Sequence, residues 1–265
     1  MTGNYKAVMI NVHEHILTIT LNRQENRNAL NDLMVNELLE ILNKYKSQSA
    51  IKVLILTGSG TAFCAGADLK YLKGLLQKDI DAHRHDSSLL REMFYALFTF
   101  PKPTIAAVNG PAIGGGCGLA NVCDLVIASH EARFGYPEVK IGFVPALVSV
   151  FLITSIGIRR AKELLLTGRI ITASEAYGYG LVSMIVDKPG ELMSRALEIA
   201  EKFKSNAPSS LKISKEFCNK IVLQNINDLL DEAARINAHS RLHDNFREGV
   251  LSFLEKRNPE WINGN

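Results

Sequence analysis

The chain has 265 residues, of which 47% are hydrophobic and 22% are charged, a composition that excludes a long disordered segment and allows a sizeable core. The net charge of +3 suits a small anionic ligand but is too low for a nucleic-acid-binding surface, and the four cysteines contain no CxxC pair. Because the sequence shows neither a secretory signal nor an apolar run of about eighteen residues, we expect a cytoplasmic protein that has no contact with a membrane.

The first hundred residues alternate between strand-like and helix-like patterns. Apolar runs separated by His13-Glu14-His15 predict an antiparallel hairpin, and a helical pattern begins at Asn31. A strand and a helix should follow, and the polar stretch after them predicts a mobile loop before the next helix. The expected ranges are 8–12 and 16–21 for the hairpin, 31–45 for the first helix, 53–57 for the strand, 69–76 for the second helix, 78–88 for the loop and 89–98 for the third helix.

The second part of the chain continues the alternation as far as residue 190. Strands are expected at 105–108, 125–128 and 182–186, and helices at 146–156 and 160–166. Alternation of this kind predicts an α/β fold with mainly parallel strands. Three helices without a strand should follow, at 191–204, 209–223 and 226–240. We therefore expect a core domain over 1–190 and a C-terminal helical domain over 191–265.

Two of the predicted strands end in loops of small residues. Ala65-Gly66-Ala67 follows the strand at 53–57, and Gly114-Gly115-Gly116 follows the strand at 105–108 and precedes a short helix. Without bulky side chains, backbone N–H groups in such loops can approach a ligand closely, and a helix N-terminus favours negative charge. These loops are therefore candidates for binding an oxygen that becomes an anion.

Other motifs have weaker support. A dinucleotide fingerprint would require a glycine where Leu119 stands, and no acidic residue lies at the expected distance beyond it. His239 and His243 have no third ligand nearby in the sequence, which argues against zinc. There is no GxSxG motif for a nucleophilic serine and no P-loop.

Four segments together resemble the enoyl-CoA hydratase/isomerase (crotonase) superfamily: Phe63-Cys64-Ala65-Gly66-Ala67-Asp68-Leu69, Ala106-Ala107-Val108-Asn109-Gly110, Gly114-Gly115-Gly116-Cys117 and Phe134-Gly135-Tyr136-Pro137-Glu138. The likeness runs nearly end to end. It implies an α/β fold, a crotonase-like spiral of ββα units with a C-terminal α-helical region. It also implies a coenzyme A (acyl-CoA) thioester as substrate, no separate cofactor or metal, and assembly as a homotrimer or as a homohexamer made of two trimers.

The resemblance also assigns roles to residues. It implies that the N–H groups of Ala67 and Gly115 form an oxyanion hole and that Glu138 is the catalytic acid/base. Glu138 follows the apolar Phe134 and Tyr136, so desolvation should raise its pKa. The substrate-binding positions implied are Arg23, Arg27, Ala65, Gly66, Asp68, Leu69, Gly114, Gly118, Pro137, Ala146 and Lys256.

One departure from the family pattern leaves the reaction open. Typical hydratases of the superfamily carry a second glutamate where this chain has Gly118, and the branched side chains of Val144-Pro145-Ala146-Leu147-Val148 should reshape the acyl pocket. We expect a hydratase/dehydratase of a short or branched enoyl-CoA, since methylglutaconyl-CoA hydratases also resemble this arrangement. The alternatives are an enoyl-CoA isomerase, a naphthoate-synthase-like enzyme with an external anion, and a non-catalytic acyl-CoA or RNA-binding relative.

Overall fold

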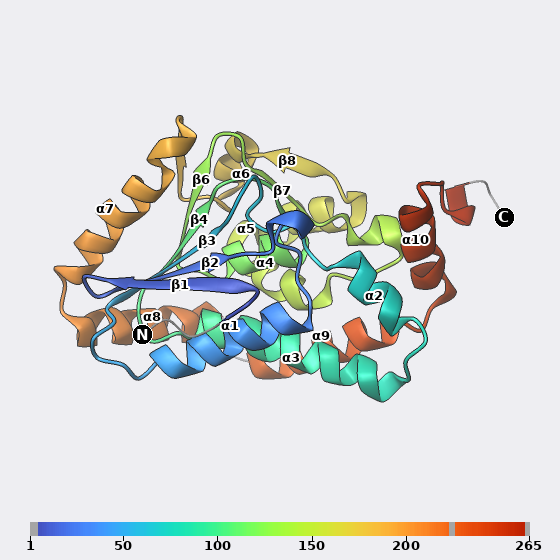
Figure 1. The fold of residues 1–265 in the computed structure, drawn as a ribbon, viewed down its shortest axis with the longest axis horizontal. Helices are drawn as coiled ribbons and strands as arrows, with labels where there is room; N and C mark the ends of the chain where they lie inside the picture. Colours follow the sequence, from blue (N-terminus) through green and yellow to red (C-terminus); the bar gives the residue numbers. More distant parts are fainter. Residues whose placement is uncertain (1–4, 223–225, 263–265) are drawn as a thin grey trace.

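A six-stranded sheet forms the centre of the molecule, in the order β1-β2-β3-β4-β6-β9 (Figure 1). The computed structural model describes residues 5–222 and 226–262. In this sheet β1 and β2 form an antiparallel hairpin, and each following neighbour is parallel to the one before it. The strands are β1 (Val8–His13), β2 (Ile16–Leu21), β3 (Val53–Gly58), β4 (Thr104–Val108), β6 (Leu125–Ser129) and β9 (Met184–Val186).

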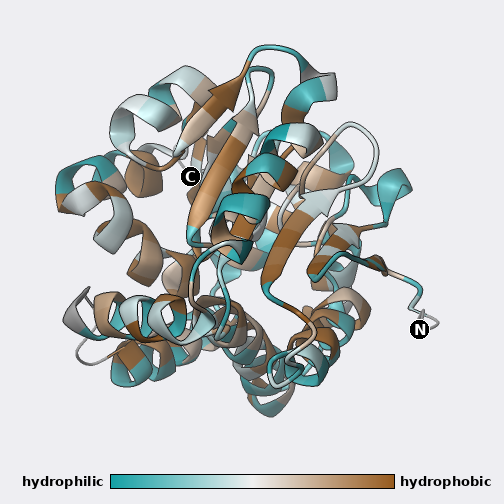
Figure 2. Ribbon diagram, turned by 90° about the vertical axis from the view of Figure 1, so that its left-hand side faces the viewer, coloured by the Kyte–Doolittle hydropathy of each residue, from teal (hydrophilic) through white to brown (hydrophobic). Residues whose placement is uncertain are grey.

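Both faces of this sheet are covered, which explains why β4 is buried along its whole length and β3 over Val53–Thr57. Successive side chains of a strand point to opposite faces. Val53 and Ile55 accordingly pack with Leu192 of α7 (Leu192–Lys204), whereas Leu54 and Leu56 belong to the larger cluster on the other side. Figure 2 shows hydrophobic colouring on strands of the sheet and on parts of the helices around it.

The larger cluster is closed by helices that lie along the second face of the sheet. They are α1 (Asp32–Tyr45), α3 (Ile80–Phe98), α4 (Gly115–Asn121) and α5 (Ala146–Thr167), and α9 (Ile226–Ser240) packs against α3 and α5. The two helices expected at 146–156 and 160–166 are the two parts of α5, which is broken between them at Gly157, where φ is 78°. None of the helices within residues 5–222 and 226–262 is both long and apolar enough to span a bilayer.

A second, three-stranded sheet brings distant loops together. Its order is β5-β7-β8, with β5 (Ala112–Ile113) parallel to β7 (Arg133–Gly135) and β7 antiparallel to β8 (Ile170–Thr172). The remaining elements are α2 (Leu69–Leu75), α6 (Ala173–Tyr179), α8 (Pro208–Val222), α10 (Asp244–Glu255), η1 (Gln24–Asn26), η2 (Pro137–Ile141), η3 (Pro189–Glu191) and η4 (Glu260–Ile262). Pairing of β5 with β7 places the residues that follow each strand, from Gly114 and from Tyr136, next to one another.

The expected α/β class with mainly parallel strands is confirmed, but the expected loop at 78–88 is wrong. Helix α3 begins at Ile80, and the Asp79 side chain caps it by accepting a hydrogen bond from the Ala82 N–H at 2.9 Å. His83 and Asp86 are polar residues on the buried face of this helix. The segment looks like a surface loop in the sequence because its inward face is polar.

The C-terminal region contains a helix that the sequence did not reveal. In addition to α7, α8 and α9 at the expected places, α10 packs against α2 and η2, where Phe246 and Val250 join Phe143 and Leu72 in a small apolar cluster. Residue 223, at the end of one expected helix, lies outside the described residues. The domain boundary between 190 and 191 stays a prediction, and α7 packs on β3, β4 and β6.

Candidate active site

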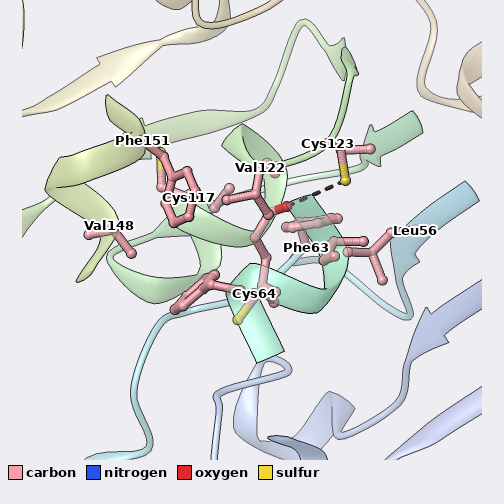
Figure 3. Close-up of a cluster of buried hydrophobic side chains, with 14 of the residues drawn as sticks. Leu56, Phe63, Cys64, Cys117, Val122, Cys123, Val148 and Phe151 are labelled. Carbon is pink, nitrogen blue, oxygen red and sulfur yellow. Dashed lines mark hydrogen bonds between the residues drawn. The ribbon is translucent and has the colours of Figure 1, made fainter. Parts of the chain in front are cut away.

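The two small-residue loops predicted from the sequence touch one another. The Ile113 N–H donates a hydrogen bond to the Cys64 carbonyl oxygen at 2.9 Å, and a Cβ on Gly116 would lie 2.2 Å from the same oxygen. Only glycine permits this approach. Cys64 and Cys117 belong to the packed cluster around this contact, in which the Cys123 thiol lies 3.5 Å from the Leu119 carbonyl oxygen (Figure 3). The loops are thus held by a solid core.

Two backbone N–H groups are left free where these loops meet. Within the described ranges, neither the Ala67 N–H nor the Gly115 N–H donates a hydrogen bond. Gly115 is the first residue of α4, a position whose N–H has no partner inside a helix. Both residues line a cavity of about 390 Å³. A ligand oxygen in this cavity therefore has two unpaired donors available.

The Glu138 carboxyl group lies over the glycine loop. The Gly114 N–H donates to the Gly135 carbonyl oxygen at 2.8 Å, which ties the loop to β7. Gly114 has φ 54°, and a Cβ there would come within 2.5 Å of Glu138 Oε1. Glu138 Oε2 is buried and has no hydrogen-bond partner among the described residues, and burial raises the pKa of Glu138 to about 7. A carboxyl group with this pKa can both accept and return a proton near neutral pH.

The structure brings one part of the predicted site together around the cavity. The predicted residues that line it are Ala65, Gly66, Ala67, Leu69, Gly114, Gly115, Pro137 and Glu138. Those that are not part of its lining are Arg23, Arg27, Asp68, Gly118, Ala146 and Lys256.

Arg23 and Asp68 form an ion pair that stabilises the start of α2. Arg23 Nη2 lies 2.8 Å from Asp68 Oδ2, and Asp68 Oδ1 caps α2 by accepting from the Lys70 and Tyr71 N–H groups. This pair fixes the end of the loop that carries Ala67. Arg27 is exposed, Ala146 opens α5, and Lys256 is exposed at the end of α10.

Gly118 faces hydrocarbon. A Cβ on Gly118 would lie 2.3 Å from Val148 Cγ1 and 3.2 Å from Phe94 Cε1, and Val148 and Phe94 both line the cavity. The space that a side chain at 118 would need is therefore already filled by the α5 side chain.

Sequence reasoning missed a polar section of the cavity wall. This section consists of Tyr71 of α2, Asp86 of α3, Asn237 of α9 and Arg241, the residue that follows α9. No local pattern links these positions, because Asp86 and Arg241 meet only through the packing of α9 on α3.

In residues 5–222 and 226–262, no group of three or more His, Cys, Asp or Glu residues is placed to hold a metal ion.

Residues 11–264 match the family described as Enoyl-CoA hydratase/isomerase. The chain belongs to this family. A Thermus thermophilus protein with an enoyl-CoA hydratase name is 44% identical over 248 residues, covering 93% of this chain and 97% of that protein. The 2,3-dehydroadipyl-CoA hydratase of Escherichia coli is 34% identical, with 96% and 98% covered.

A solved structure confirms the crotonase-like fold. The enoyl-CoA hydratase/isomerase of Xanthobacter autotrophicus superposes on this chain with a TM-score of 0.88 at 30% identity, covering 96% of this chain and 98% of the other.

Proposed function

We propose that the protein is an enoyl-CoA hydratase/dehydratase that adds water reversibly across the conjugated double bond of a short or branched enoyl-CoA thioester. The observation that carries the proposal is the Glu138 carboxyl group in the same cavity as the unpaired N–H groups of Ala67 and Gly115. Membership of the hydratase/isomerase family and the hydratase names of similar proteins support it.

In this mechanism the thioester carbonyl oxygen accepts hydrogen bonds from the Ala67 and Gly115 N–H groups. Ionised Glu138 takes a proton from water as the water oxygen bonds to C3, and the double-bond electrons move onto the carbonyl oxygen to give an enolate. Glu138 then returns the proton to C2, and the carbonyl re-forms. Each amide directed at the enolate oxygen is worth about 3 kcal/mol. The pKa of Glu138, about 7, means that the required ionised form grows as the pH rises through neutrality.

The apolar part of the cavity supports a small acyl group. Leu30, Val35, Leu72, Leu90 and Phe94 line it together with Val148, and its volume is about 390 Å³. We infer that these side chains hold the acyl chain and exclude water from all but the reacting carbons. The coenzyme A part of the substrate is then the only cofactor-like group that the reaction needs.

An enoyl-CoA isomerase is the second candidate. The space beside Gly118 is filled by Val148, so no second carboxyl group accompanies Glu138 at that position. A single acid/base that moves one proton between C2 and C4 suffices for a double-bond shift. Isomerisation therefore requires fewer catalytic groups in this site than hydration by the two-glutamate mechanism does.

The two reactions are separated by incubating the protein with crotonyl-CoA, 3-methylglutaconyl-CoA and a 3-enoyl-CoA. Hydration adds the mass of water and removes the absorbance of the conjugated thioester, whereas isomerisation leaves the mass unchanged. The Glu138→Gln variant should lose roughly 10²- to 10⁴-fold in rate, because both reactions need its proton transfer. Undiminished turnover by Glu138→Gln contradicts the assignment.

We further propose assembly as a homotrimer or homohexamer and a location in the cytoplasm. Apolar side chains left exposed on α8, Ile213 and Phe217, support burial between subunits. The four free cysteines, three of them buried, support a reducing compartment.

A further inference from the structure

A charged and hydrogen-bonded cluster forms part of the cavity wall. Tyr71, Asp86, Asn237 and Arg241 line the cavity beside the apolar residues described above. Asp86, Asn237 and Arg241 are buried. An ion pair in the wall of an acyl pocket is costly to desolvate, and a saturated hydrocarbon chain would give nothing in return.

The cluster is tightly connected. Arg241 Nη2 lies 2.6 Å from Asp86 Oδ2, and only 1% of the Arg241 side chain is exposed. The Tyr71 hydroxyl donates to Asp86 Oδ1 at 2.5 Å. Arg241 Nη2 also donates to Asn237 Oδ1 at 3.1 Å, and this oxygen accepts a second hydrogen bond from the Ser87 hydroxyl at 2.9 Å. These contacts fix the guanidinium group in position.

The guanidinium group is nevertheless only partly satisfied. Nε and Nη1 of Arg241 are buried and have no hydrogen-bond partner within residues 5–222 and 226–262. Phe143, another residue of the cavity wall, lies against the guanidinium group, with its ring centroid 5.5 Å from Cζ. Buried donors in folded proteins are nearly always paired, and Arg241 lines the cavity, so its two unpaired nitrogens call for an acceptor from outside the described chain.

We propose that the acyl chain of the substrate ends in an oxygen acceptor, a carboxylate or a hydroxyl, that pairs with Arg241. The inference rests on the proposed function, because it concerns the far end of the thioester that Glu138 acts on. A carboxylate would gain from a charge-assisted hydrogen bond. A hydroxyl would add no charge to the Asp86–Arg241 pair and could also donate a hydrogen bond to Asp86. The test therefore includes substrates that end in a carboxylate and substrates that end in a hydroxyl.

The test compares three five-carbon substrates that differ only at the end of the chain: glutaconyl-CoA with a carboxylate, 5-hydroxypent-2-enoyl-CoA with a hydroxyl and pent-2-enoyl-CoA with a methyl group. A second set of three substrates has six carbons: 2,3-dehydroadipyl-CoA, 6-hydroxyhex-2-enoyl-CoA and hex-2-enoyl-CoA. This set tests whether Arg241 lies one carbon farther from the thioester than a five-carbon chain can reach. We expect kcat/KM for at least one polar-ended substrate to exceed that of its methyl-ended counterpart by roughly tenfold or more. Which polar end is favoured identifies the acceptor.

The outcomes separate the inference from the function on which it rests. Turnover of the methyl-ended substrates as fast as or faster than the polar-ended ones in both sets overturns the inference and leaves the proposed function intact. No turnover of any of the six overturns both. This comparison uses the native protein, so it does not depend on whether a variant folds.

A pair of variants then assigns the preference to one side chain. Arg241→Met removes the donors while keeping an unbranched side chain, and the ratio of polar-ended to methyl-ended kcat/KM should fall toward one. Arg235→Met, which removes an arginine on α9 that pairs with Glu232 at the surface, should leave the ratio unchanged. A ratio that survives in Arg241→Met, with the fold verified by thermal melting, overturns the assignment to Arg241.

Discussion

The buried environment of the Glu138 carboxyl group favours its neutral, protonated form. Burial raises its pKa from 4.5 to about 7, so the folded protein keeps a proton that the unfolded chain has already lost between those pH values. The free energy of unfolding should therefore fall as the pH rises from about 4.5 to about 7. The difference in pKa corresponds to about 3 kcal/mol.

The first prediction follows from this burial. Glu138→Gln has no charge to desolvate, so its stability relative to the native protein should improve by about 2 to 3 kcal/mol between pH 5 and pH 8. Urea unfolding of both proteins at the two pH values measures the change. A constant difference between them would mean that Glu138 titrates in the folded protein as it does in the unfolded one.

The second prediction concerns the contact between Gly118 and Val148. Gly118→Glu alone should lower the free energy of unfolding by about 1 to 3 kcal/mol, because its side chain enters space occupied by Val148 Cγ1. Adding Val148→Gly removes this obstacle, and the double variant should hydrate crotonyl-CoA faster than Val148→Gly alone does. Equal rates for these two proteins, both shown to be folded, would indicate that a carboxylate at 118 does not reach the reacting water.

The residues of the candidate site differ in how easily their roles can be predicted from the sequence. Ala67, Gly115 and Glu138 each lie in a short stretch of distinctive small or apolar residues, and the structure places them around one cavity. Asp86 and Arg241 carry no such signal, since each reads as an ordinary surface charge until α9 is packed on α3. Local motifs could therefore predict the part of the site beside the glycine loop but not the polar wall.

At the scale of an element, the start of α4 is the feature with the clearest test. Gly115 is its first residue, a position where proline fits a helix but removes the N–H donor. Gly115→Pro should reduce turnover by roughly 10²-fold or more, because it deletes one of the two amides that we propose stabilise the oxyanion.

Gly115→Ala is the matched control for this third prediction. A Cβ at this position lies 3.0 Å from Leu30 Cδ1 in either variant, but alanine keeps the N–H group. The two variants should share any cost of that contact and differ in rate. If they lose activity equally, the loss comes from the contact with Leu30 and not from the missing donor.

The elements that the sequence predicted well are those whose burial follows a simple pattern. Strands β3 and β4 are mostly apolar runs because both sheet faces are covered, and α1 begins at Asp32, directly after its N-cap Asn31, whose side chain accepts from the Met34 N–H. Strands β5, β7 and β8 have only two or three residues each, too few for a period to emerge. The first turns of α3 look like a loop in the sequence because the buried Asp86 forms an ion pair with Arg241, a partner far away in the sequence.

For the molecule as a whole, the exposed face of α8 provides the fourth prediction. Ile213 and Phe217 are four residues apart on this helix and are 64% and 62% exposed. If this stripe is buried between subunits, the native protein should have a mass of at least three times 29.2 kDa by light scattering, and Phe217→Glu should shift it to smaller species. A native protein that runs at 29.2 kDa contradicts the proposed assembly.

The distribution of thiols on the folded chain has a practical consequence. Cys64, Cys117 and Cys123 are buried and burial raises each pKa to about 12, whereas Cys218 is exposed on α8, next to Phe217. Maleimide reagents attack thiolates, so they should modify the native protein at Cys218 alone. The chain thus carries a natural single attachment point for a fluorophore or spin label, and a dye at that point would lie beside the apolar stripe and respond to association of subunits.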